Sequence, residues 1–399
     1  MHKGYKAADS DMHIIEPVDL WQRYIDPKFK HVAPVGMTQW RRDMRVMVKA
    51  RVISRTWPRK GAQGTNLGWK KEQDELYALG EQRGWDPESQ LAAMDREGLD
   101  LAVVYPSRGL FVLGMDSTDA MGPDGLEPDL AAAIARAYND WLFDFCSGSK
   151  GRIFGAGMIA PHDIESAVSE ARRCAEDLKF KAIFLLPGTV NRRAWHDPYY
   201  DPLWAACQRQ DIAIGFHGGG RNFLTPDFGL EVFDRMMMYH TFTHPLGLMT
   251  ALVSFTGGGI LQRFPKIRVP FLEGNCSWSP WLMHRLDEHF KWVGAAEAQD
   301  LRKLPSEYFK ANCYLSVEAD EEPAKYAIDW SGDDNLVFST DYPHGDSKYP
   351  YSIDSFLKTS IPEKSKRKIL WDNCARLYKL NGAANASKTS VAKRAASKK

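Results

Sequence analysis

Short apolar segments recur along the chain, and each is followed by a stretch with helical spacing. They are rich in Val, Ile, Leu and Phe and do not alternate with polar residues, which is typical of strands buried on both faces. The predicted strands are Lys6–Ile15, Leu99–Tyr105, Arg152–Ile159, Lys181–Leu186, Asp211–Phe216, Ile267–Leu272, Cys313–Val317 and Asn335–Ser339.

Apolar residues at helical spacing fill the intervals between these strands. The predicted helices are Glu88–Glu97, Asp129–Phe145, Ile164–Leu178, Pro202–Gln210, Leu246–Phe255, Trp281–Val293, Glu322–Trp330 and Ser352–Leu357. Prolines mark several helix starts, because proline is tolerated at the first helical position. These prolines are Pro128, Pro202, Pro245, Pro280 and Pro323.

The alternation of strands and helices predicts parallel βαβ units, and eight such units predict an α/β protein that closes into a (β/α)8 TIM barrel. An open doubly wound sheet is the alternative, but no Gly-x-Gly-x-x-Gly motif follows the first strand. A long insertion after strand 1, residues 24–87, is typical of a lid or a subunit contact.

The C-terminal part of the chain, from Ile361 onward, differs in composition from the repeating strands and helices. Ile361–Leu380 is expected to form an amphipathic helix that closes the barrel, so that residues 1–380 make a single domain. Residues 381–399 contain Ala, Ser, Thr, Lys and Arg but no acidic residue, and we expect a disordered basic tail.

Charge and composition exclude several classes of partner. Lysine plus arginine number 52 against 51 aspartates plus glutamates, so no global field favours nucleic acid or an anionic membrane. No apolar run approaches the roughly 20 residues that span a bilayer, and the six cysteines have no Cys-x-x-Cys spacing, which fits reduced thiols. We expect a cytoplasmic protein with a small-molecule substrate and neither nucleic acid nor membrane as partner.

Polar side chains stand where the predicted strands end. Asp11 and His13 are two positions apart on the first strand, so both point to the same side. His217 ends the fifth strand just before three glycines, Glu273 ends the sixth, and Asp341 follows the eighth. Because strand ends surround one pocket in a barrel, we expect these five side chains to converge.

Imidazole and carboxylate groups at such an edge indicate a metal site formed by Asp11, His13, His217, Asp341 and Glu273. This ligand chemistry suits zinc, and also manganese or iron, while the lack of cysteine argues against a closed structural zinc site. A divalent metal lowers the pKa of bound water to about 7. Asp341 is placed to orient that water or to accept its proton.

Four motifs occur together in this order: Asp-x-His-x-x-Glu-Pro beginning at Asp11, His217 followed by three glycines, residues 262–269 leading into Glu273, and Ser-Thr-Asp-Tyr-Pro around Asp341. Over residues 6–380 the chain resembles the amidohydrolase-related family that includes aminocarboxymuconate semialdehyde decarboxylase. The resemblance implies a metal-dependent TIM barrel that hydrolyses bonds or removes carboxylate from aromatic and related acids without an organic cofactor. It also implies a homodimer.

The resemblance places Asp11 and His13 at the two ligand positions of strand one and His217 at the ligand position of strand five. Asp341 matches the strand-eight aspartate that binds metal or activates water. Glu273 departs from the pattern, because many decarboxylases of this family have an acid/base histidine there. We therefore interpret Glu273 as a further ligand or catalytic group, and this departure favours hydrolysis over decarboxylation.

Structural roles compete with these assignments. His13 and His217 are alternatively core histidines bonded to backbone carbonyls, and Asp341 is alternatively a helix cap. Glu273 is alternatively an ion-pair partner of Arg221, itself a candidate substrate-binding residue.

Three more residues have open roles. Glu16 is either a metal ligand or the residue that holds the turn before Pro17. His244 is expected in the loop after strand five, just before Pro245, and His344 in the loop after strand eight. Each of these histidines is a candidate substrate binder or proton donor.

The leading hypothesis is therefore a metal-dependent hydrolase of an ester, amide, thioester or activated carbon–carbon bond in a small organic acid, with Asp341, His244 and Glu273 as catalytic groups. The alternative is a metal-dependent non-oxidative decarboxylase of an aromatic or related acid. A third hypothesis, of another class, is a catalytically inactive barrel that serves as a binding module.

Overall fold

The computed structural model describes residues 2–39, 41–49, 51–53, 71–118, 125–218, 233 and 235–380. Within these ranges eight strands form one sheet in the order β1-β5-β6-β7-β8-β9-β10-β11, and all neighbours run parallel. They are β1 Ala8–Ile14, β5 Leu101–Pro106, β6 Ile153–Met158, β7 Ala182–Leu185, β8 Ala213–His217, β9 Val269–Leu272, β10 Cys313–Val317 and β11 Leu336–Phe338. Every predicted strand is present, with bounds within two residues of the prediction.

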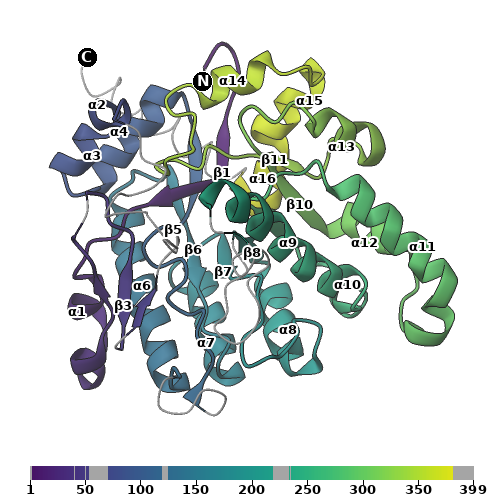
Figure 1. Cartoon of the computed structure of the whole chain (residues 1–399), viewed down its shortest axis with the longest axis horizontal. Helices are drawn as coiled ribbons and strands as arrows, with labels where there is room; N and C mark the ends of the chain where they lie inside the picture. The colour runs from purple at the N-terminus through teal and green to yellow at the C-terminus, as the bar shows by residue number, and fades with distance from the viewer. Residues whose placement is uncertain are drawn as a thin grey trace, which may run out of the picture.

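The first and last strands of this sheet meet. Ser10 Oγ donates a hydrogen bond to the carbonyl of Phe338 (2.7 Å), and the backbone N–H of His13 donates to the carbonyl of Tyr342 (2.6 Å). The sheet is thus a nearly closed barrel whose strands are surrounded by helices (Figure 1). The predicted TIM barrel is confirmed.

Helices connect the strands on the outside of the barrel (Figure 1). They are α4 Pro87–Glu97, α6 Pro128–Ser147, α7 Ile164–Glu176, α8 Asp201–Gln210, α9 Met236–Thr256, α11 Ser279–Glu297, α13 Ala324–Ser331 and α14 Ser352–Lys358. Local signals set their ends: the Asp86 side chain caps α4 by accepting from the N–H of Ser89 (2.8 Å), and Gly98 ends it with a φ of 94°. All of them except α9 begin within two residues of the prediction.

The prediction for α9 was wrong. A helix was expected over Leu246–Phe255 with Pro245 at its start, but α9 begins ten residues earlier, at Met236, and Pro245 lies inside it. Proline in a helix interior removes one backbone hydrogen bond, and burial of the helix against the barrel outweighs that loss. The other prolines stand at or near helix starts: Pro128 is the first residue of α6, Pro202 and Pro280 are the second residues of α8 and α11, and Pro323 directly precedes α13.

Outside the insertion after β1, the sequence pattern missed three short helices of the described ranges, η3 Pro198–Tyr200, α10 Ile260–Arg263 and α12 Pro305–Asn312. The C-terminal segment is helical as predicted, in three pieces: α15 Glu363–Arg367, a π-helical turn η4 Lys368–Asp372, and α16 Asn373–Tyr378. Tyr378 reaches into the barrel, where its hydroxyl lies 3.1 Å from the hydroxyl of Tyr105 and donates to the carbonyl of Ser10 (2.9 Å). The predicted closure of the barrel by this segment is borne out by these contacts. The expected basic tail lies outside the described residues.

The insertion after β1 folds into small elements: α1 Leu20–Tyr24, η1 Pro27–Val32, the antiparallel sheet β2 Val35–Gly36, β3 Val46–Val48 and β4 Arg51–Ile53, and then α2 Gln73–Leu76 and α3 Ala78–Gln82. Gln73 Nε2 donates to the carbonyl of Gly345 (2.9 Å), and the ring of Tyr77 stacks on that of Tyr349 (5.7 Å between centroids). The described part of the insertion therefore packs against the loop that follows β11. A lid or subunit role stays a prediction.

The structure also bears on the expectations about membrane-spanning segments and about the cysteines. None of the helices in the described ranges is both long and apolar enough to cross a membrane. All six cysteines are free thiols, and five of them are buried.

Glu97, on the last turn of α4, is buried and accepts a hydrogen bond from the N–H of Ile353 (2.8 Å). Burial raises the pKa of Glu97 to about 7, although hydrogen bonds from Ile353 and Ser352 act in the opposite direction. The unfolded carboxyl has the ordinary value of 4.5. The stabilisation from the protonated form is therefore complete below that pH and is lost as the pH rises through about 7.

Replacing Glu97 by glutamine is expected to flatten this pH dependence and to raise the free energy of unfolding at pH 8 by about 1–3 kcal/mol. The amide oxygen can still accept from Ile353, while no charge is buried. Urea unfolding of both proteins at pH 5 and pH 8 measures the effect. An unchanged difference in stability between the two pH values would contradict the assignment.

Candidate metal centre and active site

Strand β1 brings Asp11 and His13 to the interior of the barrel, and both side chains are fully buried. His13 Nδ1 lies 2.9 Å from the carbonyl of Pro106, at the end of the neighbouring strand β5. A carbonyl only accepts, so Nδ1 carries the hydrogen and Nε2 presents its lone pair to the barrel axis. A backbone partner of this kind is characteristic of metal-binding histidines.

Strand β8 brings His217 to the same place. His217 Nε2 lies 2.8 Å from His13 Nε2 and 3.3 Å from Asp11 Oδ1. The two imidazole rings meet edge to face, with centroids 4.5 Å apart. The predicted convergence of strands one and five is therefore present in the structure.

Asp341 and Glu273 complete the ring from β11 and β9. Asp341 Oδ1 lies 3.3 Å from His13 Nε2, and Glu273 Oε2 lies 3.3 Å from His217 Nε2. Glu273 directly follows β9 and Asp341 lies three residues after the end of β11, and both are in the left-handed region, with φ of 55° and 53°. This conformation costs a residue other than glycine about 1 kcal/mol or more and is concentrated at functional sites.

The distances fit a shared metal ion. Ligand atoms about 2.1 Å from one ion lie roughly 3.0–3.4 Å from each other at octahedral or tetrahedral angles. The separations of His217 Nε2 from Asp11 Oδ1 and of His13 Nε2 from Asp341 Oδ1 are both 3.3 Å, and Asp11, His13 and His217 form one compact group of potential ligands. Two imidazole nitrogens and several carboxylates are also the donor set that zinc, manganese and iron accept.

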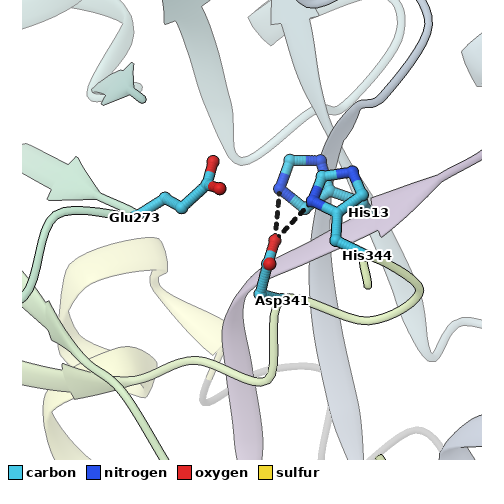
Figure 2. Close-up of side chains that lie close together, drawn as sticks. All are labelled: His13, Glu273, Asp341 and His344. Atoms are coloured by element: carbon cyan, nitrogen blue, oxygen red, sulfur yellow. Dashed lines mark hydrogen bonds and ion pairs between the residues drawn. The ribbon is translucent and has the colours of Figure 1, made fainter. Parts of the chain in front are cut away.

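A hydrogen-bonded chain extends from Asp341 to the wall of the site. Asp341 Oδ1 lies 2.6 Å from His344 Nδ1, and His344 Nε2 lies 2.9 Å from Ser107 Oγ. Figure 2 shows the rings of His13 and His344 side by side, each joined to Asp341 by a dashed line, with Glu273 directed towards the same space from the other side. His344 is almost completely buried and lies after β11, in the loop where it was expected.

The expected position of His244 was wrong in one respect. It lies on helix α9, not in a loop, because α9 begins before the proline. The residue is nevertheless at the site: it is buried, and His244 Nε2 lies 3.6 Å from Glu273 Oε1. Gly218, directly after β8, permits this approach, since a Cβ there would meet Glu273 Oε2 at 2.8 Å and His244 Cδ2 at 2.9 Å.

His244, Glu273 and Asp341 border a pocket of about 350 Å³, which His240 also lines. Its wall contains three acidic residues that sequence reasoning missed, Glu318, Asp320 and Asp346, together with Lys348, which pairs with Asp320 (2.8 Å). Burial, followed by the negative charges of Glu321, Asp346, Glu273 and Asp11, raises the pKa of the Glu318 carboxyl well above its usual range. Glu318 directly follows β10, so the rule that singled out the other strand ends would have found it.

Two predicted residues remain. The Glu16 carboxylate accepts from the N–H groups of Arg108 (2.7 Å) and Gly109 (3.0 Å), so it holds the loop after β5 and is not among the clustered ligands. The carboxylate therefore has a structural role, but it holds the loop after β5 and not, as the alternative predicted, the turn before Pro17. Arg221 lies outside the described residues.

The chain belongs to the amidohydrolase family, whose model matches residues 8–380. This match confirms the resemblance seen in the motifs.

Two decarboxylases are similar to this chain in sequence. A gamma-resorcylate decarboxylase from Polaromonas sp. (strain JS666) is 27% identical over 260 residues, which cover 63% of this chain and 78% of the relative. A 2-amino-3-carboxymuconate-6-semialdehyde decarboxylase from Dictyostelium discoideum is 25% identical over 262 residues, covering 65% of this chain and 67% of the relative.

Solved structures support the fold. A crystal structure of an amidohydrolase from Mycobacterium avium subsp. paratuberculosis superposes with a TM-score of 0.71 at 21% identity, covering 94% of this chain and 99% of the other. A dihydroxybenzoic acid decarboxylase from Polaromonas sp. JS666, with bound manganese and the inhibitor 2-nitroresorcinol, gives 0.61 at 18% identity, covering 94% and 98%. The relatives favour the decarboxylase hypothesis over the leading hydrolase hypothesis.

Proposed function

We propose that the protein is a metal-dependent, non-oxidative decarboxylase of an aromatic or related carboxylic acid. In this reaction the bond between the carboxylate carbon and the substrate carbon breaks, carbon dioxide leaves, and a proton replaces it on the substrate carbon. The observation that carries the proposal is the Asp341–His344 pair, a carboxyl hydrogen-bonded to a buried imidazole at the ligand ring. Such a pair can supply the required proton.

Asp11, His13, His217 and Asp341 are the residues that would hold the metal. Such a cation would supply positive charge that stabilises a substrate carboxylate and the oxygen of an adjacent hydroxyl group. Manganese is our choice over zinc, because the ring is rich in carboxylates and a related decarboxylase contains manganese.

The proton is handled by the protein's own side chains. Asp341 delivers it to the substrate carbon, and His344 Nδ1, 2.6 Å away, restores it. Ser107 Oγ fixes the orientation of the His344 ring from its other nitrogen. Burial of both side chains keeps this exchange away from bulk water.

The departure at Glu273 weighs less against decarboxylation in light of the geometry. The histidine that many decarboxylases have at this strand end is absent, but the imidazole of His244 reaches the same place from α9, 3.6 Å from Glu273. Proton delivery through Asp341 and His344 also does not require a histidine on β9.

The test is the product. Protein purified with Mn²⁺ is incubated with a panel of hydroxybenzoates and related acids, and carbon dioxide release is followed alongside hydrolysis of aryl esters and amides. Release of carbon dioxide with formation of the decarboxylated acid supports the proposal. Hydrolysis without release of carbon dioxide would support the hydrolase hypothesis instead. Absence of both activities across the whole panel would favour the binding-module hypothesis.

A further inference from the structure

Two histidines on α9 border the pocket that also contains Glu273. His240 and His244 are four residues apart, so they lie one helical turn apart on the same face. Their rings are 4.0 Å apart between centroids. His240, His244 and Glu273 each offer one potential ligand atom, and these three atoms lie within 4.8 Å of one another.

The hydrogen bonding of His244 directs one nitrogen to this centre. Its Nδ1 lies 3.3 Å from the backbone carbonyl of His240 and 3.2 Å from Thr243 Oγ1. Since a carbonyl only accepts, Nδ1 carries the hydrogen, and Nε2 turns its lone pair towards Glu273 Oε1. His13 is oriented in the same way by the carbonyl of Pro106.

The two oxygens of Glu273 face two different groups. Oε2 lies 3.3 Å from His217 Nε2, in the first ligand ring, and Oε1 lies 3.6 Å from His244 Nε2. A carboxylate that presents one oxygen to each of two histidine groups has the arrangement of a bridge between two ions. In enzymes with two metal ions, the ions lie about 3.5–4 Å apart.

We propose that His240, His244 and Glu273 form a second divalent-cation site, and that Glu273 bridges it to the first. The inference rests on the first metal site described under the proposed function. The protein would then hold a pair of cations, the first among strand ends and the second between β9 and α9. Two imidazoles and a carboxylate suit zinc, manganese or iron.

The charge of the pocket favours a second cation. His240, His244 and Glu273 border the same pocket as Glu318, Asp341 and Asp346. One divalent cation offsets two carboxylates, and this wall with Asp11 holds more than two.

Metal stoichiometry tests the proposal. The protein is stripped with a chelator, reloaded with Mn²⁺ and desalted, and manganese per chain is measured by mass spectrometry together with the electron paramagnetic resonance spectrum. We expect about two ions per chain and the spectrum of a spin-coupled pair. His240→Ala is expected to keep one ion per chain and to show an uncoupled spectrum.

The matched control is His289→Ala, a partly exposed histidine on α11 that does not line the pocket, and this variant is expected to keep both ions. His240→Gln serves beside His240→Ala if the smaller side chain destabilises the helix, and circular dichroism checks the fold of each variant. One ion per chain in the unchanged protein, unaffected by either substitution at His240, would overturn the second site. Carbon dioxide release does not depend on that result, so failure of the second-site proposal is distinguishable from failure of the proposed function.

Discussion

Changing Asp341 to asparagine is expected to lower kcat for carbon dioxide release by about a thousandfold, with a much smaller change in KM. A carboxamide fills the same space but cannot deliver a proton, and general acid catalysis contributes roughly 10²–10⁴ in rate. The loss appears in kcat because the proton is transferred only in the transition state. Steady-state kinetics on the best substrate from the panel measures the effect.

Asp9→Asn is the matched control for this substitution. Asp9 lies on the same strand as Asp11, one layer deeper, and accepts hydrogen bonds from the N–H groups of Asp11 (3.1 Å) and Thr340 (3.2 Å). Burial raises the pKa of Asp9 to about 7, so a neutral side chain is tolerated there. A kcat in Asp341→Asn within tenfold of the unchanged protein would remove Asp341 from proton transfer.

The second large effect is expected from His13→Ala. Its imidazole lies within 3.3 Å of both His217 Nε2 and Asp341 Oδ1, so its removal opens the centre of the ligand ring. We expect the affinity for Mn²⁺ to fall by about a hundredfold or more. In the unchanged protein, Mn²⁺ at a hundred times its Kd should add about 2.7 kcal/mol of stability, and in the variant most of this gain should be lost.

Thermal unfolding with and without Mn²⁺ measures this gain as a shift in Tm. His162→Ala is the control, since His162 is also a buried histidine bonded to a carbonyl, that of Met115 (2.6 Å), but lies outside the ligand ring. Burial lowers the pKa of His162 to about 4, so its imidazole is neutral at neutral pH. Equal shifts in Tm for His13→Ala and the unchanged protein would contradict the metal site.

The sequence predicts the barrel well because its signal is local. Each strand is a short apolar run, so its position can be read without knowing its neighbours, and the predicted bounds of Cys313–Val317 match β10 in full. The same holds for Asp11 and His13, whose shared direction follows from the alternation of a strand. The parallel order then brings His217 and Asp341 to the same edge.

What the sequence pattern misses depends on contacts between distant segments. Proline is a reliable marker of helix starts, so Pro245 misplaced α9 and moved His244 into a loop. Whether Glu16 binds metal or holds a turn is decided by Arg108, 92 residues away in sequence. The hydrogen bond between His344 and Ser107 joins residues that are 237 positions apart, so no local pattern predicts it.

Two residues at the heart of the site, Glu273 and Asp341, occupy backbone conformations that glycine would adopt more easily. The consequence concerns how the protein can change. Selection for heat resistance alone would favour glycine at these positions, because glycine relieves the local backbone strain. Under the proposed mechanism, such variants would fold normally but lose catalytic activity. Heat resistance and the proposed catalytic role therefore favour different residues at these two positions. Any attempt to raise the thermal stability of the protein has to keep both Glu273 and Asp341 unchanged.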